Sequence, residues 1–308
     1  RYAIAVILIL LLVVGASVTF FVAATEQLIR TKVIPNDIFT WHLARFLSVT
    51  SQNVVFGDSH TAYWARLTGF QNLSFPQDNV PTMEVKVRSY FSDIRPGKVI
   101  IQADHYAFAP GQQKDPPGTT KLFEGKGSRI RLWTFTDAHR SFIGDYWKLF
   151  FQGGFANTFT FRPNGGLMRE EDFSWQDENL DVRLRQVEKY VTGPGRRPVE
   201  SPEDTRSARS YHRMLGYLTS LGAEVCMVGM PFPPLLTRSM GDIPEFQGAV
   251  AFFESLATQY GVRYVDLSGA VPDTSLFLDA EHLNEAGAQE FSPLLRAACF
   301  GDPIASPA

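Results

Sequence analysis

The sequence predicts an α/β fold with a mostly parallel sheet, preceded by one membrane-spanning helix. Residues 2–24 form an uncharged apolar run, and short apolar strands alternate with helical segments over much of the remaining chain. The composition is that of an ordinary globular protein, with 44% hydrophobic and 20% charged residues among 308. Collagen-like, coiled-coil and wholly disordered classes are therefore excluded.

The net charge and the numbers of histidines and cysteines exclude two further classes of protein. A formal net charge of −3 with mixed signs leaves no basic footprint, so we expect no nucleic-acid partner. Six histidines and two cysteines are too few and too scattered for a Cys/His metal framework. We therefore expect neither a metal nor a cofactor.

Residues 2–24 are long enough to cross a bilayer, which takes about 20 apolar residues in a helix. A cleaved signal peptide and a buried core helix are the alternatives, but the apolar part of a signal peptide is usually only about 7–15 residues long. Arg1 precedes the run and Arg30 and Lys32 follow it, so the flanking charges do not settle the orientation. We expect a retained single-pass anchor in the inner (cytoplasmic) membrane, with the rest of the chain on the periplasmic, extracytoplasmic side.

The alternating elements follow a connecting stretch at 26–50. Residues 98–103 read as a buried strand because they are apolar and β-branched. Pro81 suits the first turn of a helix, and Gly222 suits a helix end. The predicted strands are 53–56, 72–75, 98–103, 224–228 and 263–266, and the predicted helices are 61–67, 81–94, 206–221, 244–260 and 285–298.

The alternation fails between about 107 and 205. This stretch is rich in glycine, proline, charged and aromatic residues, and we expect an insertion or lid over the core. Its aromatic residues suit lid packing, sugar stacking or docking on a membrane partner, and Arg196-Arg197 is expected in a solvated loop. The predicted organisation is an anchor at 1–25, a connector at 26–50, a domain at 51–300 containing the insertion, and a tail at 301–308.

A candidate nucleophile lies at the end of the first strand of this domain. Gly57-Asp58-Ser59-His60 joins the strand at 53–56 to a helix, which places Ser59 at the carboxyl end of a strand, where α/β sheets form their ligand crevices. A serine needs a base to become nucleophilic. The alternative is that Asp58 or Ser59 merely caps the helix.

A matching base lies more than two hundred residues farther along the chain. Asp279 and His282 are three residues apart, just before the last predicted helix. At this spacing the carboxylate can hold one imidazole nitrogen while the other takes the proton of Ser59.

The combination of Gly57-Asp58-Ser59 with Asp279-x-x-His282 resembles the SGNH/GDSL hydrolase superfamily. The resemblance implies a three-layer α/β/α flavodoxin-like fold, with Ser59 as nucleophile, His282 as base and Asp279 as its orienter. The glycine and asparagine that usually complete the oxyanion hole are missing, since Ser74 stands near the glycine's place and Asp104-His105 follow the third strand.

Other groups are therefore candidates for the oxyanion hole and the pocket. The backbone N–H groups of Ser59 and Ser74, or the side chain of His105, are the candidate oxyanion donors. Asp58 and His60 are further pocket candidates, with a helix-start surface position as the alternative for His60. An ionised Asp104 would oppose an oxyanion, so we expect it to have a partner or a structural role.

An N-terminal anchor joined to such a domain is similar to membrane-anchored O-acyltransferases of the alginate and cellulose O-acetylation type and the teichoic-acid D-alanine transfer type. The resemblance implies a polytopic membrane-bound O-acyltransferase as acyl donor partner and a polysaccharide as acceptor, with residues 2–24 in the lipid bilayer. An anchored esterase or deacetylase and a catalytically inactive glycan-binding scaffold are the alternatives. Cys226 and Cys299 either pair, as cysteines outside the cytoplasm can, or remain two buried thiols.

Overall fold

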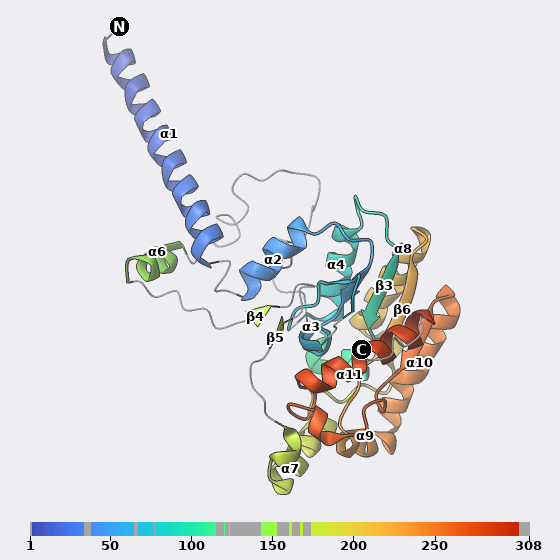
Figure 1. Cartoon of the computed structure of the whole chain (residues 1–308). Coiled ribbons are helices and arrows are strands. Elements are labelled where there is room, and N and C mark those ends of the chain that lie inside the picture. The colour runs from blue at the N-terminus through green and yellow to red at the C-terminus, as the bar shows by residue number, and fades with distance from the viewer. Residues whose placement is uncertain are drawn as a thin grey trace. The chain divides into compact units, whose positions relative to one another are not determined.

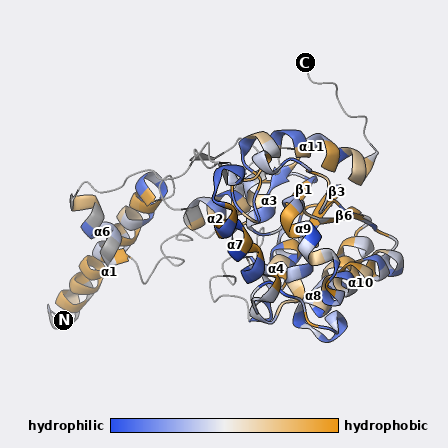
Figure 2. Cartoon of the chain, turned by 90° about the horizontal axis from the view of Figure 1, so that it is seen from below, coloured by the Kyte–Doolittle hydropathy of each residue, from blue (hydrophilic) through white to orange (hydrophobic). Residues whose placement is uncertain are grey.

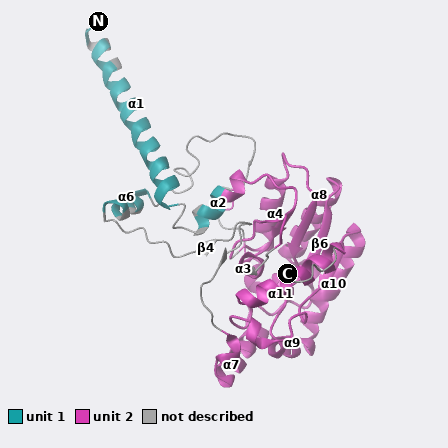
Figure 3. Ribbon diagram, in the orientation of Figure 1, with its two compact units in different colours: residues 1–44, 127–159 teal, residues 45–126, 160–308 magenta. Residues whose placement is uncertain are grey.

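The computed structural model describes residues 2–33, 38–64, 67–76, 78–114, 120, 123, 143–152, 160–161, 167–168 and 174–301. The chain forms two compact units (Figure 3). The first comprises residues 1–44 and 127–159, and the second comprises residues 45–126 and 160–308. The predicted insertion is thus divided between the two units.

The first unit is built on a long apolar helix. Helix α1 (Tyr2–Leu28) continues into a π-helical turn, η1 (Ile29–Val33), and α6 (Ile143–Gln152) belongs to the same unit (Figure 1). The segment from Ala5 to Val33 is long and apolar enough to cross a membrane. Figure 2 shows its hydrophobic colouring along almost the whole of α1. Helix α2 (Ile38–Ser48) spans the boundary between the units.

The second unit contains a five-stranded parallel sheet. Its strands are β1 (Val54–Phe56), β2 (Gln71–Asn72), β3 (Lys98–Gln102), β6 (Glu224–Gly229) and β7 (Arg263–Asp266). They pair in the order β2-β1-β3-β6-β7, which is the flavodoxin-like order of a doubly wound sheet. The strand order reverses between β1 and β3, and that is where such folds form their ligand crevice.

Side chains that alternate along the strands divide the core into two layers. Val55, Ile100 and Cys226 lie in register across three strands and belong to one buried cluster with Phe291 of helix α11. On the other face, Phe56 packs edge-on against Tyr90 of helix α4. The sheet is therefore covered on both faces, as a parallel sheet requires. The predicted three-layer α/β class with an apolar N-terminal helix is confirmed.

The helices of the second unit follow the predicted pattern with two additions. Those close to their predicted positions are α3 (Ser59–Trp64), α4 (Val80–Tyr90), α8 (Arg206–Ser220), α10 (Pro244–Tyr260) and α11 (Glu285–Phe300). The additions are α7 (Leu180–Thr192), inside the predicted insertion, and α9 (Pro234–Gly241), after β6. Short 3-10 turns lie at His105–Phe108, Pro110–Gln112, Trp175–Asp177, Pro202–Asp204 and Thr274–Leu276. The strands β4 (Thr160–Phe161) and β5 (Leu167–Met168) form a small antiparallel pair.

The described aromatic residues of the predicted insertion do not lie together in one unit. Trp175 is buried in the core of the second unit, and its backbone N–H donates to Phe277 O at 2.8 Å. Trp147, Phe150 and Phe151 lie on α6 of the first unit. Trp133, Phe155 and Phe159 lie outside the described residues.

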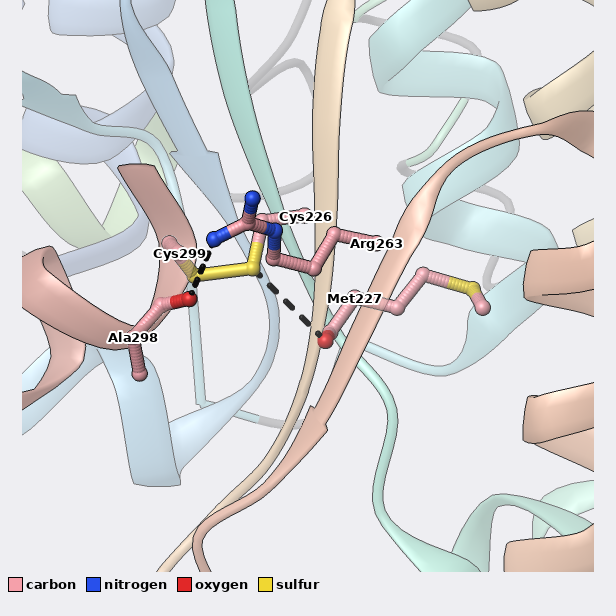
Figure 4. Close-up of a disulfide and its surroundings, with 5 residues drawn as sticks. All are labelled: Cys226, Met227, Arg263, Ala298 and Cys299. Atoms are coloured by element: carbon pink, nitrogen blue, oxygen red, sulfur yellow. Dashed lines mark hydrogen bonds between the residues drawn. A yellow bond between two sulfur atoms is a disulfide. The ribbon is translucent and has the colours of Figure 1, made fainter. Parts of the chain in front are cut away.

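The two cysteines form a disulfide. Cys226 of β6 and Cys299 of α11 are bonded, with their Cα atoms 5.6 Å apart (Figure 4). Both residues are buried. Next to the disulfide, the guanidinium of Arg263 donates to the carbonyl of Ala298 at 2.9 Å. The bond therefore ties the C-terminal end of α11 to the centre of the sheet, and it resolves the alternative that the sequence left open.

Candidate active site

Ser59 is the first residue of α3, three residues beyond the end of β1. The carboxylate of Asp58 accepts the backbone N–H of His60 at 2.9 Å, so Asp58 caps the helix. The Gln102 side chain accepts the N–H of Asp58 and donates to its carboxylate, both at 2.8 Å. A Cβ on Gly57 would overlap Thr61 Oγ1 and Gln102 Oε1. Gly57 is therefore required because neighbouring side chains approach it closely.

Asp279 and His282 lie in a tight loop just before α11. One carboxylate oxygen of Asp279 accepts the backbone N–H groups of Glu281 and His282, each at 2.8 Å. The loop is closed by a hydrogen bond from Leu278 N to His282 O at 2.8 Å, and Asn284 caps α11 directly after it. These bonds fix the carboxylate beside the imidazole.

The fold brings the three residues into one hydrogen-bonded chain. His282 Nε2 lies 2.9 Å from Ser59 Oγ, and His282 Nδ1 lies 3.0 Å from the carboxylate oxygens of Asp279. Ser59 and His282 are 223 residues apart in the sequence. The order of hydroxyl, imidazole and carboxylate can move a proton from the serine to the histidine, whose positive charge the aspartate then stabilises.

Asp279 is held in its charged form. Burial opposes the charge on the carboxylate, but the hydrogen bond and charge of His282, together with two backbone N–H donors, lower the pKa of Asp279 to about 2. The carboxylate therefore stays ionised at every pH at which a neutral imidazole can act as a base.

Of the three candidate oxyanion donors, one has no acceptor among the described residues, and that is the backbone N–H of Ser59. The backbone N–H of Ser74 donates to Asn72 Oδ1 at 3.0 Å, and the Ser74 hydroxyl is enclosed. His105 lies 3.3 Å from the hydroxyl of Tyr190 and lines a separate cavity of about 380 Å³. Burial lowers the pKa of His105 to about 3, so its ring is neutral.

His60 is completely buried, so the surface position considered for it is wrong. Its Nδ1 lies 2.9 Å from Asp104, and its Nε2 lies 3.6 Å from Glu281. Burial opposes a charge on the ring, but the hydrogen bond to Asp104 and the nearby carboxylates of Glu281 and Asp58 outweigh it and raise the pKa of His60 to about 10. His60 is therefore an imidazolium at neutral pH.

Asp58 and Asp104 belong to this buried cluster. Asp104 accepts the backbone N–H of Met230 at 2.7 Å and contacts His60, so it has the partner expected of it. Asp58 accepts from Gln102 and from the hydroxyl of Tyr106. Its carboxylate therefore takes part in the buried network around Gln102, and its described bonds make it a support for the turn that carries Ser59.

Arg196 lies in the expected loop, but the sequence analysis did not identify it as a site residue, and its side chain is only 29% exposed. Its guanidinium pairs with Glu281 and lies 4.7 Å from the centre of the Tyr106 ring. No motif marks this residue, because its partners come from two distant segments. Arg196, Lys189 of α7, Tyr190 and His282 line a pocket of about 540 Å³. The base therefore lines a cavity whose walls carry both cationic side chains and the carboxylates of Asp279 and Glu281.

No family model matches the chain, and no curated protein matches it. Among solved structures it is similar to TesA, with 11% identity and a TM-score of 0.41 over 81% of this chain and 98% of that one. It is also similar to a lipase/acylhydrolase from Enterococcus faecalis, with 12% identity and a TM-score of 0.38 over 79% of this chain and 92% of that one. Both TM-scores are below 0.5, so the chemistry of the site is inferred from its own geometry.

Proposed function

We propose that the protein is a serine-dependent acyl-transfer enzyme with Ser59 as nucleophile. The observation that carries this proposal is the unbroken chain from Ser59 Oγ through His282 to Asp279, at 2.9 and 3.0 Å. A structural serine at a helix start has no need of an imidazole that is itself oriented by a partly buried carboxylate. The catalytically inactive scaffold is therefore the less favoured reading.

The reaction takes place in two halves. Ser59 Oγ attacks an ester carbonyl while its proton passes to His282 Nε2, and the Ser59 N–H stabilises the oxyanion. The carbonyl re-forms, the alcohol leaves with the proton from His282, and an acyl-Ser59 remains. An acceptor hydroxyl then gives its proton to His282 and attacks the acyl group, which forms a new ester. Ser59 Oγ leaves and takes the proton back from His282, which restores the enzyme.

The acceptor in this proposal is a hydroxyl of a glycan, and the acyl group is acetyl. The pocket of about 540 Å³ beside His282 is large enough for a sugar unit. Its walls carry hydrogen-bonding groups from Gln186, Tyr190 and Arg196, which suit a hydroxyl-rich acceptor. The apolar helix α1 would anchor the enzyme in the inner membrane, facing the periplasm, beside a polytopic acyl donor. An oxidising compartment also suits the buried disulfide.

The test uses the full chain in detergent with p-nitrophenyl acetate. We expect an acetyl group on Ser59 by peptide mass spectrometry, and loss of nearly all turnover in Ser59→Ala and His282→Ala, because triad members act as a unit. Ser239→Ala is the control, since the partner of that hydroxyl among the described residues is the carbonyl of Leu235 within α9. Full activity of Ser59→Ala would refute the assignment.

The same enzyme distinguishes transfer from hydrolysis. An oligosaccharide acceptor should speed the loss of the acetyl group from Ser59 and gain the acetyl mass itself. Rapid release of acetate with no acylated oligosaccharide, with or without a donor partner, would make the protein an esterase. Absence of any acyl-Ser59 would favour the inactive scaffold.

A further inference from the structure

Helix α6 carries an aromatic face that its own unit leaves largely uncovered. Phe151 is 78% exposed and Phe150 is 42% exposed. The rings of Trp147 and Phe151 stack with centroids 5.9 Å apart, and Trp147 meets Phe150 edge-on at 5.7 Å. Lys148, which is also exposed, lies about 160° around the helix axis from Phe150 at 3.6 residues per turn. The helix is therefore amphipathic, with a continuous aromatic side.

This aromatic side begins at the end of the apolar span. The indole N–H of Trp147 donates to the hydroxyl of Thr25 at 3.1 Å, and the Trp147 ring stacks on Phe21 at 6.1 Å. Both partners lie in the last two turns of α1, and Figures 1 and 2 draw α6 beside this helix. The position of α6 along α1 is thus fixed by a hydrogen bond as well as by ring packing.

The same level marks the polar boundary of the span. Residues 2–24 carry no charge, and the first charges come with Glu26 and Arg30, which form an ion pair at 2.9 Å. Aromatic side chains with a polar edge collect where a membrane span meets water. Amphipathic helices with aromatic residues on their apolar side lie in that boundary, about 5–10 Å into the headgroup region.

From these contacts we infer that α6 is an interfacial membrane helix. Its Trp147, Phe150 and Phe151 side enters the bilayer at the headgroup boundary beside the C-terminal end of α1. The partner of this surface is the lipid bilayer, because the aromatic side continues the apolar surface of α1. The inference rests on the proposed membrane anchor, and it assigns these three aromatic residues to lipid and not to a lid over the active site.

The test places a spin label on the full chain in vesicles of phosphatidylcholine and phosphatidylglycerol. The native cysteines are paired, so Phe150→Cys offers a single free thiol for labelling. Lys148→Cys is the matched control on the opposite side of α6 from Phe150, and Val13→Cys reports on the middle of α1. We expect the labels at 150 and 13 to collide several-fold more often with oxygen, which dissolves in lipid, than with a water-soluble nickel chelate. The label at 148 should show the opposite preference.

The three labels separate the possible failures. A label at 150 that meets the nickel chelate as often as the label at 148 does, while the label at 13 reports lipid, would overturn the interfacial helix and leave the anchor standing. A label at 150 shielded from both reagents would show that protein covers this side, and would also overturn it. Contact with the nickel chelate at 13 as well would refute the membrane anchor and the interfacial helix together. None of these outcomes depends on activity at Ser59.

Discussion

The ring of His60 packs edge-on against the ring of His282, with centroids 5.0 Å apart and ring planes at 89°. Tyr63 meets the same imidazole edge-on at 5.6 Å, and Asp279 bonds its Nδ1. The base is therefore oriented by two aromatic contacts as well as by a hydrogen bond. His60, the residue next to the nucleophile in the sequence, thus supports His282. The positive charge of His60 is itself stabilised by the carboxylates that contact it.

The charge on His60 predicts how stability depends on pH. The groups facing it are the carboxylates of Asp58, Asp104 and Glu281, and together they raise its pKa from 6.5 to about 10 against the opposing effect of burial. Because the pKa of His60 is higher in the folded protein than in the unfolded one, its protonated ring stabilises the fold. This contribution to the free energy of unfolding is fully present below pH 6.5 and is lost as the pH rises toward 10. The free energy of unfolding by urea should therefore fall across this window.

The variant His60→Gln tests this assignment. It should lower the free energy of unfolding by about 3–5 kcal/mol at neutral pH, because it leaves Asp104 buried without its charged partner, and the fall between neutral and alkaline pH should flatten. His212→Gln is the control, since the described partners of His212 are the Tyr260 hydroxyl and nearby aromatic rings. An unchanged slope in His60→Gln would show that another group titrates in this window.

Gly57→Ala should damage both folding and activity. The added methyl would overlap Thr61 Oγ1 and Gln102 Oε1, so the turn that carries Ser59 must shift. We expect a loss of about 1–3 kcal/mol in the free energy of unfolding, typical of overpacking, with a clear fall in ester turnover. Gly248→Ala in α10 is the control, since nothing lies within 4 Å of its added methyl. It should keep full turnover and gain up to about 1 kcal/mol from helix propensity.

Ser74→Ala tests whether the Ser74 hydroxyl takes part in catalysis. The hydroxyl is enclosed and has no hydrogen-bond partner among the described residues, and the backbone N–H of Ser74, which the substitution keeps, is already bonded to Asn72. Removing this buried hydroxyl should leave the free energy of unfolding unchanged or raise it slightly. Ester turnover should stay within about twofold of the parent, far from the roughly 10²–10³-fold loss that follows removal of an oxyanion donor. A loss of that size in kcat would show that the Ser74 hydroxyl acts as an oxyanion donor.

The sequence predicted the sheet because its signals are local. Buried parallel strands such as 98–102 are continuous apolar runs, and helices such as 244–260 are long enough to identify from their pattern. The motifs around Ser59 and His282 were also sufficient to predict that these two residues meet. Each motif places its residue at the end of a recognisable element, and the fold class brings those elements together.

The surroundings of the site escaped prediction because they depend on long-range contacts. The charge of His60 comes from Asp104 and Glu281, which are 44 and 221 residues away. Arg196 lies in a loop whose Pro, Gly and charged residues are typical of solvent exposure, and its distant contacts with Glu281 and Tyr106 hold its side chain in the site. The grouping of α6 with α1 likewise depends on contacts of Trp147 with residues more than 120 positions away, a hydrogen bond to Thr25 and ring stacking on Phe21.

The disulfide predicts a separable effect on stability. Cys226 and Cys299 are 73 residues apart, so the bond removes much of the chain entropy of the unfolded protein. The double variant Cys226→Ala/Cys299→Ala should lower the free energy of unfolding by about 4 kcal/mol on this entropic model. Ester turnover at low temperature should survive, because the bond lies at the C-terminal end of α11 and the His282 loop precedes its N-terminal end.

Urea unfolding with and without a reducing agent checks the origin of that loss. Reduced parent protein should unfold close to the double variant, and the reducing agent should leave the double variant unchanged. If oxidised and reduced parent protein unfold at the same urea concentration, the bond contributes nothing to stability. Turnover in the double variant can also be lost along with stability while the protein remains folded. In that case the disulfide also positions the loop that carries Asp279 and His282, and the expectation that the two ends of α11 act independently is wrong.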